Sequence, residues 1–491
     1  MAYLQHPDAI YVGGEWQPTS VREPVINPAD ESLLIEAPVG SASQVEAAIA
    51  AARRAFDTGD WPRLPDSERQ AVMTRFLNAV EARKAAIVDM IVAEAGATRM
   101  LAEFLQYGIP MKHARRTVEI AGRPAVTSLP VELTPNAQGG KTLGTGVVSR
   151  EPIGVVGAIS PYNFPFFLNI GKVVPAMVAG CTVVLKPSPY TPMEALILGE
   201  IADEVGLPKG VLSIVTGDVE AGKLLTTDPR VDLVHFTGSD KVGAMIQAQS
   251  APTLKRIVME LGGKSALIVR ADADIQQAAM AGLAGFTVHC GQGCALTTRH
   301  LVHNSIRPQF VAAVQAMLGH LKMGNPADPT VTYGPLIREV ARKRTEDYVA
   351  IALDEGATLV AGGKRPADFQ RGFFFQPTLF DNVRNDSRLA QEEVFGPIGA
   401  VIGFDDDEEA IALANASDFG LSGAIWSADA GRAYEMALRL RTGGVAINGG
   451  AGTMQSDAPF GGIKRSGYGR EYGEDGLNEF TYQKVIGFHA A

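Results

Sequence analysis

Two stretches near the N-terminus carry apolar residues at three- to four-residue spacing, the pattern of amphipathic helices. They cover residues 41–56 and 66–96, and each begins with a Ser or Asp that can cap a helix. From Gly154 the pattern changes to short, β-branched apolar runs: "GVVGAI", "CTVVLK", "GVLSIV", "VDLVHF" and "LKRIVM". Helical segments such as "PMEALILGEIADEVG" separate several of them. Strands that alternate with helices predict a parallel sheet covered on both faces, with ligands bound beyond the carboxyl ends of the strands.

A second alternating region runs from about Lys264 to Val445, with apolar runs such as "ALIV" and "GAVIGF". Residues 127–152 differ from both regions because they combine an alternating pattern with turn residues. This pattern indicates an exposed hairpin, and an exposed strand edge usually needs a partner strand. We therefore expect an α/β protein with two α/β domains and a projecting hairpin.

Composition narrows the class of protein. A chain of 491 residues exceeds the size of a single hydrophobic core, which predicts two or three domains. The net charge of −10 disfavours nucleic acid and anionic membrane as partners. The N-terminus lacks the pattern of a signal peptide, and the longest apolar stretch, residues 173–185, is shorter than the ~18 residues of a membrane span. With only three cysteines, we expect a cytoplasmic protein without disulfides.

The segment "FTVHCGQGCALTTR" holds two of the three cysteines, Cys290 and Cys294, and three histidines lie close by. A zinc site is disfavoured because the spacing is not the usual two-pair arrangement, so we expect no metal. A cysteine hydrolase is a further alternative, although no local signature supports it. Cys294 follows a turn of small residues that can present a nucleophile, whereas Cys290 and Cys181 are expected to be packed in the core.

Other motifs surround this segment in a fixed order. They are "SPYNFPF" (160–166), "VVLKPSPYTP" (183–192), "FTGSDKVG" (236–243), "MELGGKS" (259–265), "EEVFGP" (392–397) and "PFGGIKRSGYGREYG" (459–473). Together they resemble the NAD(P)-dependent aldehyde dehydrogenase superfamily over nearly the whole chain. The resemblance implies a Rossmann-like coenzyme domain, an α/β catalytic domain and a β-hairpin that serves oligomerisation.

The resemblance also implies the reaction, which is oxidation of an aldehyde to a carboxylic acid through a thiohemiacetal and a thioester on Cys294. Asn163 would stabilise the oxyanion, and Glu260 would activate the hydrolytic water and could deprotonate the thiol. Each residue also has a structural interpretation. Asn163 could cap a helix that begins near Pro165, and Glu260 could be an exposed carboxylate at a strand end.

For the cofactor we expect NAD, with NADP as the alternative. Gly238 and Gly243 lie at a strand-to-helix turn where backbone N–H groups can meet a pyrophosphate, although Gly-x4-Gly is not the dinucleotide fingerprint. In the family, Lys186 holds the adenine ribose, Glu393 holds the nicotinamide ribose, and Phe395 lies beside the nicotinamide ring. The other expected cofactor-binding residues are Ile159, Ser160, Pro161, Ser188, Gly217, Phe236, Ser239, Leu261 and Gly262.

The chain departs from the family pattern in three respects. Pro189 stands where many members have a glutamate that binds the adenine ribose, and His289-Cys290 replaces an asparagine-glutamine pair. Small residues stand where relatives often have large ones, Gly171 in the place of a tryptophan above all, so we expect a bulky, largely apolar aldehyde. The residues expected to line its pocket are Phe164, Phe167, Leu168, Gly171, Val288, Gly293, Ala295 and Phe460. Lys172 is expected to face away from this pocket.

We expect the coenzyme domain to span residues 1–126 and 153–262, the catalytic domain 263–470, and the oligomerisation element 127–152 and 471–491. The protein is expected to be a homodimer or homotetramer. Two other functions remain open: a CoA-acylating dehydrogenase and a non-enzymatic binding protein of the same fold. Family members of the first kind tend to lack the glutamate of "MELGG", and the second would be expected to have lost Cys294 or Glu260.

Overall fold

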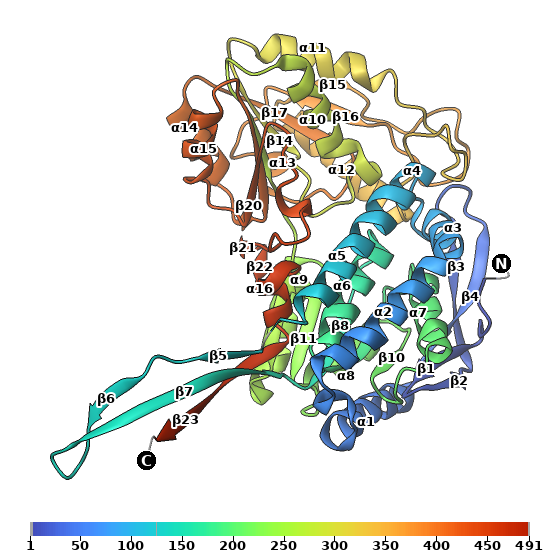
Figure 1. Cartoon of the computed structure of the whole chain (residues 1–491). Helices are drawn as coiled ribbons and strands as arrows, with labels where there is room; N and C mark the ends of the chain where they lie inside the picture. The colour runs from blue at the N-terminus through green and yellow to red at the C-terminus, as the bar shows by residue number, and fades with distance from the viewer. Residues whose placement is uncertain (1–2, 124, 490–491) are drawn as a thin grey trace.

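A sheet of eight strands forms the centre of the first domain, in the order β2-β1-β10-β9-β8-β11-β12-β22 (Figure 1). The computed structural model describes residues 3–123 and 125–489. The five apolar runs predicted from the sequence are its parallel strands: β8 (Val155–Ile159), β9 (Thr182–Lys186), β10 (Leu212–Ile214), β11 (Leu233–Thr237) and β12 (Arg256–Glu260). The antiparallel strands β1 (Ala9–Val12) and β2 (Glu15–Pro18) extend the sheet beyond β10, and the antiparallel β22 (Gly467–Tyr468) forms the opposite edge. In chain order the parallel strands lie third-second-first-fourth-fifth, which is the Rossmann arrangement, and the order reverses between β8 and β11.

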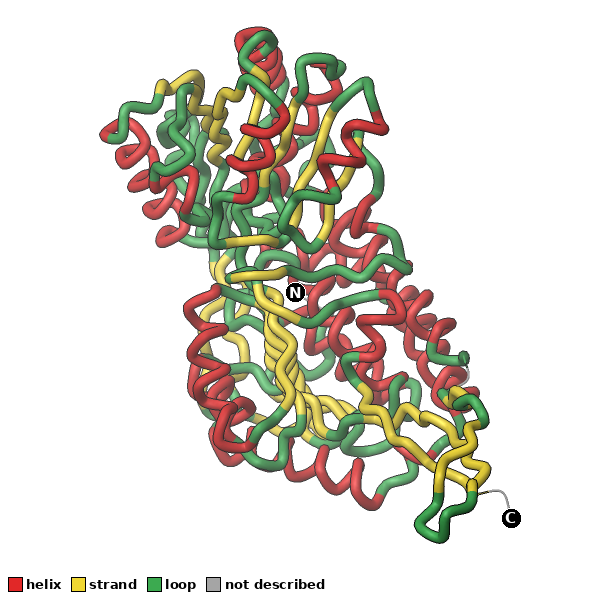
Figure 2. The backbone as a smooth tube through the Cα atoms, turned by 90° about the vertical axis from the view of Figure 1, so that its left-hand side faces the viewer, coloured by secondary structure: helices red, strands yellow, loops and turns green. Residues whose placement is uncertain are grey.

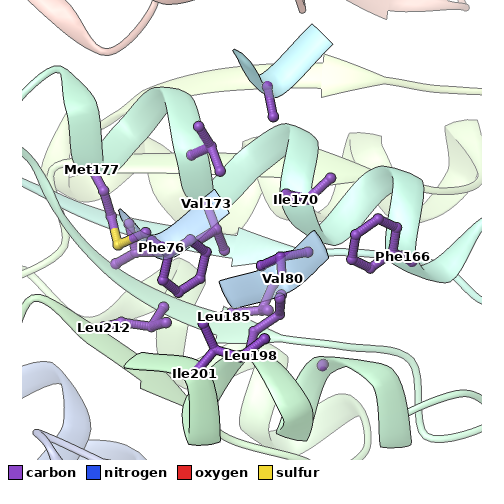
Figure 3. Close-up of a cluster of buried hydrophobic side chains, with 14 of the residues drawn as sticks. Phe76, Val80, Phe166, Ile170, Val173, Met177, Leu185, Leu198, Ile201 and Leu212 are labelled. Atoms are coloured by element: carbon purple, nitrogen blue, oxygen red, sulfur yellow. The ribbon is translucent and has the colours of Figure 1, made fainter. Parts of the chain in front are cut away.

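Helices cover both faces of this sheet, because successive strand residues point to opposite sides. Val156, Leu185 and Leu212 pack against α2 (Asp66–Ala82), α3 (Lys84–Ala95), α5 (Ile109–Ile120), α6 (Pro165–Val178) and α7 (Met193–Glu204) (Figure 3). Val155 and Val184 pack against α1 (Ala42–Thr58), α8 (Val219–Thr227) and α9 (Asp240–Ser250). The helix predicted over residues 66–96 is in fact two helices, because Arg83 leaves the helical conformation at φ −95° and ψ 9°.

The second domain has a seven-stranded sheet in the order β15-β16-β17-β14-β13-β19-β20, parallel except for β15. Its strands are β13 (Ala266–Val269), β14 (Arg299–His303), β15 (Thr358–Ala361), β16 (Thr378–Asp381), β17 (Ile398–Phe404), β19 (Ser422–Trp426) and β20 (Gly444–Ile447). One face carries α10 (Ile275–Thr287) and α11 (Arg307–Leu318). The other carries α12 (Glu339–Asp354), α13 (Arg388–Gln391), α14 (Asp407–Asn415) and α15 (Ala430–Ala437).

A four-stranded arm projects away from the two domains (Figures 1 and 2). It contains β5 (Val126–Ser128), β6 (Glu132–Pro135), β7 (Lys141–Pro152) and β23 (Thr481–His489), and β7 pairs with the other three strands. The predicted hairpin therefore finds its partner strand in the C-terminal segment of the same chain. Within the predicted element 471–491, β23 lies in the arm, whereas α16 (Gly473–Asn478) packs on α5 and α6. The proposed domain boundaries stay a prediction.

In the part of the chain that the structure describes, none of the helices combines the length and apolar character needed to cross a membrane.

The core of the first domain generates a stability prediction. Phe76 of α2 is fully buried among the residues of Figure 3, so Phe76→Ala should lower the free energy of unfolding by about 3–5 kcal/mol. Phe104, which is 70% exposed, provides a matched control. Phe104→Ala should change the free energy of unfolding by less than about 0.5 kcal/mol. Denaturant unfolding followed by circular dichroism measures both values. Equal losses in the two variants would show that this cluster does not hold the domain together.

Candidate active site

The carboxyl ends of the parallel strands bring the predicted residues of the first domain to one edge of the sheet. Ser160 follows β8, Lys186 ends β9, and Glu260 ends β12. Ser239 follows β11, and its side chain accepts a hydrogen bond from Val242 in the first turn of α9. This edge faces the second domain, which contributes Cys294 and Glu393.

Two glycines after β12 allow the domains to touch. A Cβ atom at Gly263 would overlap the backbone carbonyl of Cys294, and one at Gly262 would overlap the carboxylate of Glu393. The backbone N–H of Gly263 also donates to Glu393 Oε1 at 2.9 Å. Only glycine fits at both positions, and this explains the paired glycines of "ELGG".

Residues 288–298, here called the nucleophile loop, carry Cys294 and turn sharply before it. His289, Cys290 and Gly291 all have left-handed backbone conformations, with φ of 47°, 56° and 73°. Such conformations are costly for residues with a side chain and persist only where packing imposes them. A Cβ at Gly291 would overlap the carbonyl of Gly396, so the glycine is required. The turn leaves Cys294 partly exposed, with its side chain at the wall of a cavity.

The other cysteines lie in packed surroundings. The Cys290 thiol is 3.0 Å from the Tyr333 hydroxyl, which itself donates to the carbonyl of Phe375. Cys181 donates to the carbonyl of Phe480 at 3.2 Å. Within residues 3–123 and 125–489, no group of three or more His, Cys, Asp or Glu side chains is arranged to hold a metal ion. Cys294 is therefore the cysteine placed to meet a substrate.

Burial controls the protonation of the reactive groups. Burial, together with the nearby carboxyl groups of Glu260, Glu393 and Glu471, raises the pKa of Cys294 to about 12. At neutral pH the thiol is protonated and needs a base to become a nucleophile. Glu260 is 1% exposed, and both of its carboxylate oxygens lack a hydrogen-bond partner among the described residues. Burial, then the charge of Glu471, raises its pKa well above the usual range. An exposed carboxylate at a strand end, the structural interpretation of Glu260, is thus wrong.

Asn163 is not a helix cap. Helix α6 begins at Pro165, with Phe164 at the N-cap position and no side-chain cap. Instead the Asn163 side-chain amide donates to the carbonyl of Gln292, two residues before Cys294, at 2.9 Å. An amide has a second N–H, which leaves one donor beside the nucleophile.

A buried cluster next to Glu260 was not anticipated from the sequence. The Lys172 ammonium lies 2.6 Å from Glu471 Oε1, and His235 Nε2 lies 2.8 Å from the same oxygen. Despite burial, the charge of Lys172 lowers the pKa of Glu471 to about 2, so this carboxylate is ionised. Polar residues within apolar runs ("LVHF", "IGKVV") were the only available signal, since such residues are rarely buried without a partner.

The cavity beside Cys294 has a volume of about 270 Å³ and a mostly apolar wall. All but one of the expected pocket residues line it: Phe164, Phe167, Leu168, Val288, Gly293, Ala295 and Phe460. Gly171 does not line it, because a Cβ there would already lie 3.1 Å from the Tyr472 hydroxyl. Tyr472 thus fills the space that the absent side chain at 171 would leave. Further lining residues are Leu105, His113, Leu296, Ser422, Gly444, Val445, Ala446, Ala451, Gly452, Met454 and Glu471.

None of the expected cofactor residues, all of which the structure describes, lines the cavity beside Cys294. Glu393 is buried, which raises its pKa to about 7, and Lys186 is buried, which lowers its pKa to about 8. The Lys186 ammonium donates to the carbonyls of Pro187 and Gly217, both at 2.9 Å, so one N–H remains for a ligand.

Glycines shape this region too. A Cβ at Gly238 would overlap the ring of Phe236, and one at Gly243 would crowd the side chain of Leu261. The turn between β11 and α9 thus carries only the short side chain of Ser239, so backbone N–H groups at the helix start can approach a phosphate. Phe395 lies at φ 56° and packs edge-on against Tyr162, with ring centroids 6.1 Å apart. Ile159, Pro161 and Ser188 lie at the ends of β8 and β9, beside Ser160 and Lys186.

Known proteins share this arrangement. A model of the aldehyde dehydrogenase family matches residues 16–486. A 3-succinoylsemialdehyde-pyridine dehydrogenase from Pseudomonas sp is 38% identical, with 97% of each chain covered. An aldehyde dehydrogenase from Mycobacterium tuberculosis, solved with NAD+, is 41% identical, with a TM-score of 0.91 and 98% and 97% of the two chains covered.

A point mutant of betaine aldehyde dehydrogenase from Staphylococcus aureus, solved with NAD+ and a BME-modified cysteine, is 34% identical. Its TM-score is 0.93, with 99% of this chain and 98% of that chain covered. The family model, these similarities over nearly full length and the geometry of the site agree. The chain belongs to the aldehyde dehydrogenase family.

Proposed function

We propose that this enzyme oxidises a bulky, largely apolar aldehyde to the carboxylic acid with NAD, through covalent intermediates on Cys294. The observation that carries the proposal is the position of Cys294. Its side chain lines an apolar cavity. The nucleophile loop there contacts the segment that follows Glu260 at the buried end of β12.

In the first half of the reaction, Cys294 attacks the aldehyde carbonyl after Glu260 or a water has taken the thiol proton. The free N–H of the Asn163 side chain and the backbone N–H of Cys294 stabilise the oxyanion of the thiohemiacetal. A missing oxyanion donor typically costs about a hundred- to thousandfold in rate. Loss of hydride then leaves a thioester on Cys294.

In the second half, Glu260, which has by then released any proton taken from the thiol, accepts a proton from the water that attacks the thioester carbonyl; the C–S bond breaks, and Cys294 leaves as the thiolate. Both Glu260 oxygens are unpartnered and shielded from bulk solvent, so the carboxylate is free to bind a water. A carboxyl group whose pKa is raised by burial is a stronger base once ionised. The position of Glu260 beside the nucleophile supports hydrolysis over transfer of the acyl group to CoA.

NAD accepts the hydride when it is bound. Lys186 fits a role at the adenine ribose because it keeps a free N–H, and Glu393 fits one at the nicotinamide ribose because its buried carboxylate can accept from hydroxyl groups. Ser160, Ser188, Ser239 and the glycines of the β11–α9 turn complete the proposed site. NAD is the cofactor in the two structural neighbours described above.

The substrate class follows from the cavity wall. Among the described residues, no Lys or Arg lines the cavity, whereas Glu471 does, so an aldehyde that carries a carboxylate would be costly to desolvate. Phe164, Phe167 and Phe460 provide apolar contact instead. Tyr472 makes the cavity narrower than Gly171 alone would predict.

We also propose a homo-oligomer assembled through the arm. The arm exposes apolar side chains, among them Leu133 on β6, Val485 and Phe488 on β23, and Val131 just before β6, each at least 51% exposed. Exposed apolar strands of this kind mark protein interfaces.

The roles of Cys294 and Glu260 are tested by pre-steady-state kinetics. Cys294→Ala should abolish NADH formation, whereas Cys290→Ala, its matched control, should retain most of it. Glu260→Gln should slow steady-state turnover at least a hundredfold. That variant should still produce up to one NADH per site in a burst, provided that the thiol is deprotonated by water. Equal losses in the two cysteine variants, or full turnover by Glu260→Gln, would contradict the assignment.

The cofactor preference is tested at position 189. Because position 189 has no carboxylate, kcat/KM should be higher with NAD than with NADP, but the ratio of the two should stay below several thousand. Pro189→Glu should increase this preference tenfold or more, because the carboxylate binds the ribose hydroxyls and repels the 2′-phosphate, while the uncharged Pro189→Gln should not. A preference above several thousandfold in the wild type would contradict the role given to Pro189.

The substrate class is tested with acetaldehyde, hexanal, a terpenoid aldehyde and an aromatic aldehyde. Each buried methylene should raise kcat/KM by up to about fourfold, since it contributes up to ~0.8 kcal/mol. Tyr472→Ala should raise kcat/KM further for the largest aldehydes. Tyr434→Ala, at a tyrosine that is 59% exposed, should leave kcat/KM unchanged for every aldehyde. Gly171→Trp should destabilise the protein, because Tyr472 occupies the space. If acetaldehyde is the best substrate of the wild type, the proposed substrate class is wrong.

A further inference from the structure

Asn163 lies in a segment whose backbone has few partners of its own. Residues 160–164 connect β8 to α6 and form neither helix nor strand. Within the described part of the chain, no backbone N–H donates to the Asn163 carbonyl. Asn163 is only 3% exposed, and buried backbone carbonyls nearly always have a hydrogen-bond partner. Side chains therefore have to hold this carbonyl in place.

Two side chains bond the Asn163 carbonyl. Gln106 Nε2 donates to it at 3.3 Å, and the His289 ring is its second partner. Because a carbonyl only accepts hydrogen bonds, the amide nitrogen of Gln106, and not its oxygen, faces Asn163. Gln106 is fully buried, and among the described residues this is the one hydrogen bond of its side chain. The first domain and the nucleophile loop thus each supply one partner of this carbonyl.

The local backbone around Gln106 is unusual. Gln106 lies in a single π-helical turn, η2 (Ala102–Gly108), which continues directly into α5. In this turn the backbone N–H of Ile109 donates to the carbonyl of Phe104, five positions earlier. Such turns are rare and occur frequently at functional sites. The turn packs against α6, and its Leu105 lines the cavity, so it borders the reaction site.

The side chain of Asn163 is anchored separately, on the nucleophile loop. Its amide donates to the carbonyl of Gln292 at 2.9 Å. The Gln292 side chain in turn donates to the carbonyl of His289 at 3.1 Å and accepts from the backbone N–H of Ile337 at 3.0 Å. The planar side-chain amide of Asn163 keeps one free N–H, and the direction of that N–H is set once both the backbone and the side chain are held.

We propose that Gln106 is a positioning residue for the oxyanion donor: its bond to the Asn163 carbonyl holds the backbone from which the free side-chain N–H reaches the substrate oxygen. This inference rests on the proposed function. Without Gln106 the carbonyl keeps only His289, so the connecting segment can shift with the nucleophile loop. A displaced donor stabilises the oxyanion less, because this stabilisation depends on geometry. Gln106 does not line the cavity, so binding of the aldehyde is unaffected.

The first test removes the donor without changing the size of the side chain. Gln106→Met should slow NADH formation in a single turnover at least about fivefold, since the oxyanion donor is misplaced. Stopped-flow absorbance with saturating NAD and with enzyme in excess over hexanal measures this rate. The enzyme concentration that gives half of the maximal rate should change less than about twofold, because binding is retained.

Gln70 offers a matched control. Its Nε2 also donates to a backbone carbonyl, that of Val118 at 2.6 Å, without touching Asn163. Gln70→Met should therefore keep the wild-type rate. Should Gln106→Met not fold by circular dichroism, Gln106→Leu, which also lacks a donor, provides the same comparison.

A double variant separates positioning from a merely structural role. Asn163→Ala removes the oxyanion donor and should slow the single turnover about a hundred- to thousandfold. If Gln106 acts through Asn163, adding Gln106→Met to Asn163→Ala should slow it by less than about twofold more, because no donor remains to be positioned. Multiplication of the two single effects, or a wild-type rate in Gln106→Met, would overturn the role of Gln106. A wild-type rate in Asn163→Ala would instead refute the oxyanion role within the proposed function.

Discussion

The close contact between the end of β12 and the nucleophile loop is the constraint on which the site depends. Gly262 and Gly263 have no side chains, so the backbone of the first domain reaches the carbonyl of Cys294 and the carboxylate of Glu393. This contact places the buried Glu260 of one domain beside the thiol of the other. The apolar cavity is lined by other residues than those expected to bind the cofactor.

Burial gives this site its electrostatic character. The Cys294 thiol has a raised pKa, as do the carboxyl groups of Glu260 and Glu393, because the charged form of each is poorly solvated. Glu471 is the exception, since Lys172 compensates its charge at 2.6 Å. The thiol and the Glu260 carboxyl are therefore both protonated at rest, and Glu260 must release its own proton before it can accept that of the thiol. This arrangement avoids a permanently exposed thiolate.

Much of the fold and of the site could be predicted from the sequence. The runs that form β8 to β12 are apolar throughout because both sheet faces are covered, and strand ends in such sheets converge on one edge. For this reason Asn163, which follows β8, and Glu260, which ends β12, could be expected to lie at one edge, whereas the position of Cys294 beside them was implied by the family resemblance.

Three features could not be predicted, and each depends on a contact over a long sequence distance. Tyr472, which lies about 300 positions from Gly171 in the sequence, fills the space beside it. The small residue at position 171 therefore does not open the pocket. The orientation of Lys172 depends on Glu471, and neither local spacing nor hydrophobicity reveals such a pair. The break at Arg83 falls within a continuous helical pattern, because packing rather than helix propensity decides where α2 ends.

The most direct test of this account is to identify the covalent intermediate. Wild-type enzyme quenched in acid during turnover of hexanal with NAD should carry the hexanoyl group on the peptide that contains Cys294, as seen by peptide mass spectrometry. The adduct should be absent when either hexanal or NAD is omitted. An acyl group on Cys290 or on another residue would contradict the account. So would continued turnover by the Glu260→Gln variant without an adduct on Cys294.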